Sequence, residues 1–303
     1  MRLGLCCIFL QEDIRFRTTT AKALDRLRPK ARIHKLRDLA AHNAASLHAA
    51  IEFCSTHDIG CFRVNSQILP LKTHPRLGYE ADVLGEQVIK AFFRCGELAR
   101  RTDTRVSFHP DQFVVLSSPD RRVVKNSLAE LEYQAEVAEW IGADVINVHG
   151  GGGYGDKSAA LRRLVKTVGE LSAGARSRLT LENDDRTYTP TDLLPACKEL
   201  ALPLVYDVHH HRCHRDDLDE ETATRYAIET WNREPLFHVS SPRDGWQAPN
   251  PRSHSDYINL RDFPSLWDEM EITVEVEAKA KELAVRKLKT ALERRAKRKE
   301  SRR

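Results

Sequence analysis

Residues 105–150 read "RVSFHPDQFVVLSSPDRRVVKNSLAELEYQAEVAEWIGADVINVHG", and this stretch contains one strand–helix–strand unit. Its two ends, 105–110 and 144–150, are short apolar runs that favour strands. Between them, 122–141 has the pattern of an amphipathic helix. A strand that is joined to the next strand through a helix is typical of a parallel sheet with helices on its faces.

The same unit recurs along the chain. Strands are expected at eight short runs, namely 2–8, 60–65, 105–110, 144–150, 178–184, 202–210, 236–241 and 271–278. Helices are expected between most of these runs, at 43–58, 83–102, 122–141, 158–172, 191–200 and 220–232. The seventh unit is irregular, because 241–257 is a proline-rich loop without a clear helix.

We therefore predict an α/β fold: a single (β/α)8 TIM barrel at 1–282, followed by a basic, partly helical C-terminal extension at 283–303. A doubly wound open sheet is the alternative, but no G-x-G-x-x-G sequence follows the first strand. No apolar run reaches eighteen residues, and the seven scattered cysteines do not form a disulfide framework. These features predict a cytoplasmic protein with no membrane partner.

The C-terminal extension is strongly basic. From Lys279 to Arg303 there are twelve Lys or Arg residues against three Glu, although the net charge of the whole chain is only +4. The remainder of the chain is therefore slightly acidic. Such a segment is either a solvated helix or a surface that contacts phosphates, since clustered cations release counterions from nucleic acid.

Histidines and carboxylates stand at the ends of the predicted strands or in the loops that follow them. In a (β/α)8 barrel the carboxyl ends of all strands converge on one face. Nine such side chains come from seven of the eight units: His74, His109, His149, Glu182, Asp207, His210, His238, His254 and Glu277. So many potential ligands on one face predict a metal site.

The types of ligand narrow the choice of metal. Imidazole and carboxylate without thiolate suit Zn²⁺, Mn²⁺ or Fe²⁺. Nine ligands imply two or three ions, because each ion with an open position uses three or four protein ligands. Neighbouring ions of this kind are suited to displacement at phosphorus.

The stretch "YDVHHHRCH", residues 206–214, contains four of the histidines. Asp207 and His210 are its predicted ligands, with Asp207 pointing inward from the sixth strand. We expect His209, His211 and His214 to lie on the following loop, as solvated residues or as supports for the ligands.

Several segments together resemble the UV damage endonuclease family, which is related to endonuclease IV and to xylose-isomerase-like barrels. They are "FRVNSQILPLKTHP", "SFHPDQFVVLSSP", "NVHGGGGYGDK", "LENDDRTYTPTDLLPACKEL", "LPLVYDVHHH" and "VEAKAKE", in this order up to about residue 282. The resemblance implies the same nine ligands, with Glu182, His109, His149 and Glu277 in the catalytic centre. It also implies three divalent ions, with Mn²⁺ first and Zn²⁺ or Mg²⁺ as alternatives.

By the same resemblance, the enzyme is a monomer that takes part in DNA excision repair. Its substrate is damaged double-stranded DNA at the nucleoid, where downstream repair proteins follow it, as in nucleotide excision repair. It cleaves the phosphodiester bond 5′ to UV photoproducts and to other lesions such as abasic sites.

DNA contacts are expected from Gln112 and Phe113, which would fill the gap in the base stack, and from Lys157 after the glycine-rich run. The family has a tyrosine, an asparagine and, in some members, a modified lysine where this chain has Leu5, Phe9 and Leu236. It also has a tyrosine in place of Phe113. These departures are expected to affect which lesions are recognised and the rate of cleavage.

Two other functions fit the same pattern. A sugar isomerase or epimerase on this barrel would use one or two divalent ions and acid–base groups. A damage-binding homologue with weak catalysis would recognise distorted duplex DNA, and Leu5, Phe9 and Leu236 are the residues that favour it.

Overall fold

The computed structural model describes residues 1–301 and contains one eight-stranded sheet. The strands are β1 (Arg2–Cys6), β2 (Cys61–Val64), β3 (Arg105–Phe108), β4 (Val145–His149), β5 (Leu179–Glu182), β6 (Leu204–Val205), β7 (Leu236–Val239) and β8 (Thr273–Val276). All pairs are parallel, and β1 pairs with both β2 and β8. A parallel bridge between Asp207 and His238 closes the remaining gap between the sixth and seventh units.

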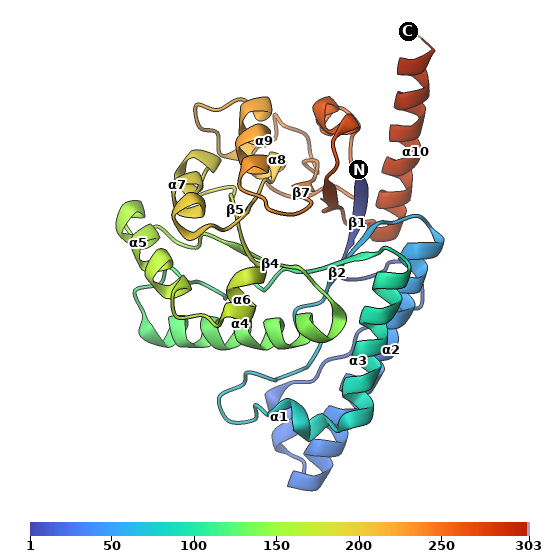
Figure 1. The fold of residues 1–303 in the computed structure, drawn as a ribbon, viewed down its shortest axis with the longest axis vertical. Helices are drawn as coiled ribbons and strands as arrows, with labels where there is room; N and C mark the ends of the chain where they lie inside the picture. The colour runs from blue at the N-terminus through green and yellow to red at the C-terminus, as the bar shows by residue number, and fades with distance from the viewer. Residues whose placement is uncertain (302–303) are drawn as a thin grey trace.

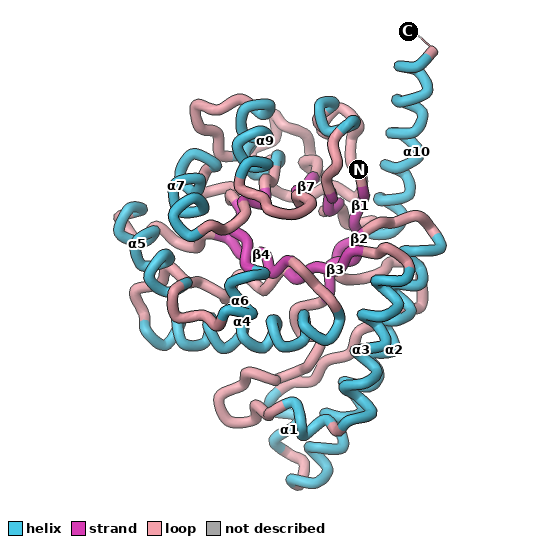
Figure 2. The backbone as a smooth tube through the Cα atoms, viewed as in Figure 1, coloured by secondary structure: helices cyan, strands magenta, loops and turns pink. Residues whose placement is uncertain are grey.

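The strands form a ring in Figure 2. The predicted TIM barrel is therefore confirmed, and the open-sheet alternative is wrong. All eight predicted strands are present, each shorter than predicted. The largest error concerns 202–210, where only Leu204 and Val205 are in strand conformation.

Helices cover the outside of the ring (Figure 1). They are α1 (Ala21–Asp25), α2 (Pro29–Thr56), α3 (Glu86–Arg101), α4 (Arg121–Ile141), α5 (Lys157–Val168), α6 (Ala173–Arg178), α7 (Pro190–Leu200), α8 (Val208–Cys213), α9 (Glu220–Glu229) and α10 (Lys281–Glu300). Two short 3-10 helices precede α3 and β8, namely η1 (Ala81–Leu84) and η2 (Ser265–Glu269). Among residues 1–301, no helix has the combination of length and apolar character needed to cross a membrane.

The inside of the barrel contains buried polar and charged side chains. Alternate residues of each strand point inward, so Thr180 and Glu182 of β5 face the interior. Gly4 on β1 makes room for the chain of Glu275 on β8, since a Cβ at this position would lie 3.1 Å from the Cγ of that glutamate. The small residue therefore lets a carboxylate occupy the middle of the barrel.

The helix α8 explains the error in the sixth unit. The side chain of Asp207 accepts a hydrogen bond from the backbone N–H of His210, at 2.7 Å, and so caps the helix. His209 and His211 are consequently buried on a helix, which corrects the expectation of a loop and of solvated side chains and leaves a supporting role open. His211 is held between the Tyr206 hydroxyl, at 2.7 Å, and a carboxylate oxygen of Asp216, at 2.8 Å. His214 follows as the C-cap residue.

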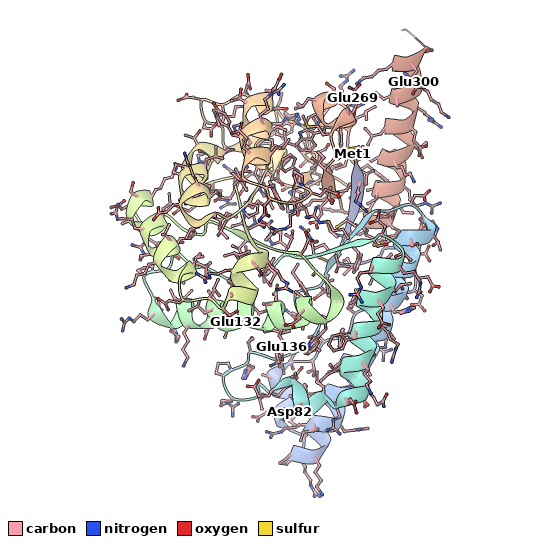
Figure 3. All side chains as sticks on the ribbon, viewed as in Figure 1. Met1, Asp82, Glu132, Glu136, Glu269 and Glu300 are labelled. Carbon is pink, nitrogen blue, oxygen red and sulfur yellow. The ribbon has the colours of Figure 1, made fainter. Side chains whose placement is uncertain are left out.

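Most of the basic extension is helical and forms α10, while residues 302–303 lie outside the described part of the chain. Lys289 pairs with Asp58, which precedes β2, and Lys299 pairs with Asp268 of η2, which precedes β8. Figure 3 shows Glu300 at the end of this helix on the same side of the molecule as Glu269. The basic end of α10 therefore lies at the amino ends of the strands, opposite to the face where the ligands were predicted.

Candidate metal centre

Glu182 is the carboxylate around which the site is built. It is the last residue of β5 and has no exposed surface. One of its oxygens, Oε2, lies 2.9 Å from His109 Nε2, and the other, Oε1, lies 3.1 Å from His238 Nδ1. The side-chain amide of Asn147, on the neighbouring strand β4, donates to Oε2 at 2.5 Å. These contacts fix the plane of the carboxylate.

Three groups of side chains place their ligand atoms within 4.8 Å of one another. The groups are His109, Glu182 and His238; His149, Glu182 and His210; and Asp207, His238 and Glu277. Glu182 belongs to two of them and His238 also belongs to two, so the three groups form one connected centre. Seven of the nine predicted ligands are therefore brought together.

The residues of this centre fit divalent metal ions. Asp207 Oδ2 and His149 Nδ1 are buried and have no hydrogen-bond partner in the described chain, although buried polar atoms are normally paired. Seven imidazoles and carboxylates in contact match the ligand chemistry of Zn²⁺ and Mn²⁺. The three groups thus present side chains of the kinds that bind divalent ions.

Burial and close neighbours shift the pKa values of several groups in the centre, and the nearby carboxylates raise those of His210 and His238. Burial opposes ionisation of Glu182, yet the neighbouring His238, His149 and His109 hold the pKa of its carboxyl well below the usual range. Burial lowers the pKa of His149, which favours the neutral imidazole. A metal ion binds carboxylates and neutral imidazoles, so its binding would release protons from His210 and His238.

Sequence reasoning did not identify two charged residues that lie beside the centre. Arg63 on β2 donates to Glu277 Oε1 at 2.6 Å and lies 3.2 Å from Glu275 Oε2. Glu275 in turn contacts His238 Nε2 at 3.1 Å. The signal was available, because an alternating strand that buries Glu277 toward the barrel axis also places Glu275 inside, one layer below.

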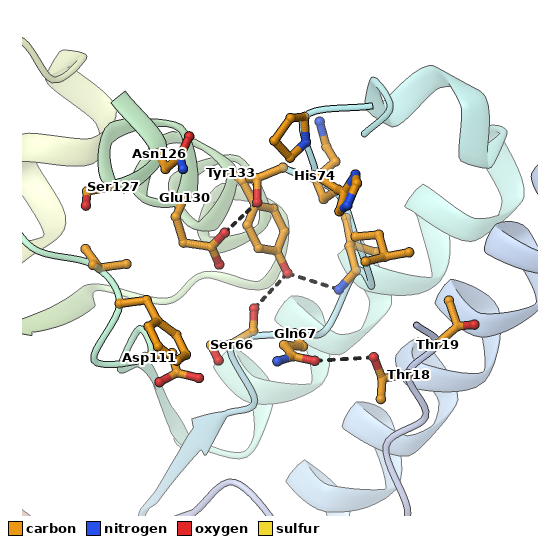
Figure 4. Close-up of a pocket in the computed structure, with 17 residues that line it drawn as sticks. Thr18, Thr19, Ser66, Gln67, His74, Asp111, Asn126, Ser127, Glu130 and Tyr133 are labelled. Atoms are coloured by element: carbon orange, nitrogen blue, oxygen red, sulfur yellow. Dashed lines mark hydrogen bonds between the residues drawn. The ribbon is translucent and has the colours of Figure 1, made fainter. Parts of the chain in front are cut away.

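His254 and His74 are not part of the three groups found among residues 1–301. His254 lies at the edge of the centre, with Nδ1 3.7 Å from Glu277 Oε2. The Nδ1 atom of His74 accepts from the backbone N–H groups of Arg76 and Leu77, both at 3.2 Å. His74 lines a separate cavity of about 360 Å³, shown in Figure 4 with Glu130 and Tyr133.

The residues predicted to contact DNA differ in their surroundings. Phe113 is 75% exposed, which excludes the role of a core aromatic. Gln112 lines a cavity of about 460 Å³ into which His149 and His210 also open. Lys157, by contrast, is bound to Asp192, with 2.6 Å between Nζ and Oδ2, so a phosphate would have to compete with this carboxylate.

Three of the four positions that depart from the family pattern, namely Leu5, Phe9 and Leu236, are apolar and buried. Leu5 lies on β1, and Phe9 follows it, packed against Phe53 and Phe62. Leu236 lies at the amino end of β7 in a small cluster with Val145 and Val205. None of the three supplies a polar atom to the metal centre.

Comparison with known proteins places this geometry in a family. Residues 1–301 match the family model described as "UV-endonuclease UvdE". The chain belongs to this family. Curated relatives called UV DNA damage endonuclease include one from Nostoc sp., 33% identical over 95% of this chain and 89% of its own, and one from Deinococcus radiodurans, 34% identical over 95% and 94%. The resemblance seen in the sequence is thus confirmed.

Solved structures agree with membership of the UvdE family. The crystal structure of SacUVDE matches with a TM-score of 0.85 and 25% identity, over 97% of this chain and 98% of that one. Endonuclease IV from Thermus thermophilus matches with a TM-score of 0.62 at 16% identity, over 97% and 100%. D-psicose 3-epimerase from Clostridium cellulolyticum shares the fold as well, with a TM-score of 0.58 at 13% identity, over 96% of both chains. The last two likenesses concern the fold alone.

Proposed function

We propose that this protein is a metal-dependent DNA repair endonuclease that cleaves damaged duplex DNA 5′ to UV photoproducts, and at other lesions such as abasic sites. The observation that carries the proposal is the connected centre in which Glu182 and His238 each belong to two groups of metal ligands. Membership of the chain in the UvdE family supports damaged DNA as the substrate. Mn²⁺ is the proposed ion, with Zn²⁺ or Mg²⁺ as alternatives and three as the proposed number.

All nine predicted ligands remain part of the proposal. His254 is within reach of Glu277, and His74 lies on the loop between β2 and α3. When bound, divalent ions supply a nucleophile at neutral pH and neutralise charge on a scissile phosphate. The protein contributes the fixed positions of the ligands: Asn147 orients Glu182, and the backbone carbonyl of Asn183 lies 3.0 Å from His210 Nδ1.

Recognition of damage is proposed to depend on the exposed Phe113 and the adjacent Gln112. A lesion lowers the cost of unstacking the duplex, so part of the selectivity comes from the DNA itself. Stacking of an aromatic ring on a base is worth about 1–3 kcal/mol by substitution. A phenylalanine retains this stacking although it lacks the hydroxyl group of tyrosine.

Nicking of a UV-irradiated duplex tests the proposal, with an intact duplex as the comparison and Mn²⁺, Zn²⁺ or Mg²⁺ added to metal-stripped protein. Glu182→Gln and His109→Ala should each lower the rate of nicking by about a hundredfold or more. Glu182 belongs to two of the ligand groups, and His109 contacts its carboxylate. Glu221→Gln, on the exposed face of α9, is the matched control and should leave the rate unchanged.

Three results would contradict the proposal. Nicking at the wild-type rate by the Glu182 and His109 variants would show that the centre does not catalyse the reaction. Turnover of ketoses without any cleavage of damaged DNA would favour the epimerase alternative, and damage-selective binding without nicking would favour a binding homologue.

A further inference from the structure

The turn that follows β1 exposes two aliphatic side chains beside the metal centre. Ile8 is 46% exposed and Leu10 is 53% exposed, whereas Phe9 between them is buried. Single exposed apolar side chains are ordinary, whereas several that gather on one face of a protein mark a contact surface. The metal centre as described above uses neither residue.

The position of this turn follows from its hydrogen bonds. The backbone N–H of Cys7 donates to the carbonyl of Arg63, at 2.9 Å, directly after the last residue of β1. The guanidinium group of the same Arg63 contacts Glu277 of the metal centre at 2.6 Å. Ile8 and Leu10 are therefore on the rim of the face that carries the centre.

The turn is held in place from several sides. Its start is tight, because Ile8 N–H donates to the Cys6 carbonyl at 2.8 Å while Cys7 has a φ of 64°. Phe9 packs edge-on against Phe53, with ring centroids 5.2 Å apart. The buried carboxylate of Glu282 accepts from Leu10 N–H, at 2.9 Å, and from the next N–H, at 2.7 Å. Ile8 and Leu10 are thus presented in fixed positions, which reduces the entropy lost on binding.

The same face carries most of the exposed apolar side chains of the described chain. Nine large hydrophobic residues are exposed within residues 1–301. Five of these lie in segments that follow the carboxyl ends of strands: Ile8, Leu10, Phe113, Tyr154 and Tyr257. The apolar surface is therefore concentrated where the proposed substrate would bind.

We propose that Ile8 and Leu10 contact the faces of bases that are unstacked at the lesion in duplex DNA. This inference rests on the proposed function. The turn is suited to bases rather than to phosphates, because its two exposed side chains are apolar and the neighbouring Arg15 donates to the carbonyls of Glu12, at 2.5 Å, and Phe9, at 3.3 Å. Base faces in a regular duplex are covered by their neighbours, so an apolar surface gains contact only where stacking is interrupted. The turn would then favour damaged over intact DNA without reading sequence.

The test uses the full chain with Mn²⁺ and the double variant Ile8→Ser, Leu10→Ser, with Tyr226→Ser on α9 as an exposed control outside this face. Binding is measured for a duplex with one UV photoproduct and for the intact duplex of the same sequence and salt. The damaged duplex should lose about tenfold in affinity, whereas the intact duplex should not change. A 2-aminopurine opposite the lesion should lose the fluorescence increase that the wild-type protein induces.

A second substrate separates recognition from cleavage. In a duplex whose lesion is already unpaired by a bulge, the double variant should nick at the wild-type maximal rate. Two outcomes would overturn the inference: loss of affinity for damaged and intact duplexes alike, or no loss of affinity at all. Nicking by the wild-type protein would still support the proposed function in either case.

Sedimentation tests whether the surface binds a second copy of the chain. A wild-type dimer that dissociates in the double variant would overturn the inference and assign the surface to that contact. Because serine could disturb the turn, Leu10→Gln alone must show the same selective loss in a protein of unchanged melting temperature.

Discussion

Replacement of Arg63 by methionine would remove the guanidinium group that contacts both Glu277 and Glu275. Arg63 is 11% exposed at its side chain, and Glu275 is 1% exposed. Burial opposes ionisation of Glu277, yet Arg63 and His238 hold the pKa of its carboxyl well below the usual range. Without the arginine, His238 would be the one close basic group that contacts both buried carboxylates, at 3.1 Å from Glu275 and 3.5 Å from Glu277. Removing one partner from a buried ion pair typically costs about 3–5 kcal/mol.

Urea or thermal unfolding of the metal-free protein measures this cost. For a chain of this size, a loss of that magnitude corresponds to a fall in melting temperature on the order of 10 °C. A divalent ion bound to Glu277 would replace part of the missing positive charge. Added Mn²⁺ should therefore stabilise Arg63→Met more than it stabilises the wild type, because ligand binding to the folded state shifts the equilibrium.

Arg105→Met is the matched control. Arg105 forms a partly buried pair with Asp144, at 3.0 and 2.8 Å, near the amino ends of the strands and away from the centre. It should be destabilised to a similar degree, without additional recovery in Mn²⁺. Stability of Arg63→Met within about 1 kcal/mol of the wild type, or equal recovery of both variants in Mn²⁺, would refute the reasoning.

Three further outcomes are expected. Asn147→Ala removes the amide that donates to Glu182 at 2.5 Å. The affinity for the metal ion, measured by titration calorimetry, should therefore fall by about 10- to 100-fold. Truncation after Leu292 removes the basic end of α10 on the side opposite to the centre, so the salt dependence of binding to a short damaged duplex should stay constant; a smaller slope would show that this end contacts phosphates. Asp216 has a pKa lowered to about 2, since hydrogen bonds from Thr191 and its neighbours outweigh partial burial. Its stabilising contribution is complete above the unfolded pKa of about 3.9 and is lost as the pH falls toward 2, so Asp216→Asn should differ from the wild type in urea melts at pH 6 but not near pH 2.

The sequence by itself determined the barrel and the face that carries the site. Alternation of strands and helices is a local property, because period and turn signals depend on neighbouring residues. His109, His149 and Glu182 could be placed at one face because all strands of such a barrel point the same way. The family was likewise visible from short motifs that keep their order.

Only the tertiary structure decided how these residues are connected. That Glu182 and His238 each serve two groups of ligands depends on distances across the barrel, which no local pattern contains. Burial of His211 depends on Tyr206 and Asp216, and the role of Arg63 depends on two glutamates more than 200 residues away in the chain. The basic segment at the C-terminus was equally evident in the sequence, but its position opposite the centre follows from the direction of α10. Charge and periodicity are read along the chain, whereas coordination, burial and the face of a helix are decided by which distant segments meet.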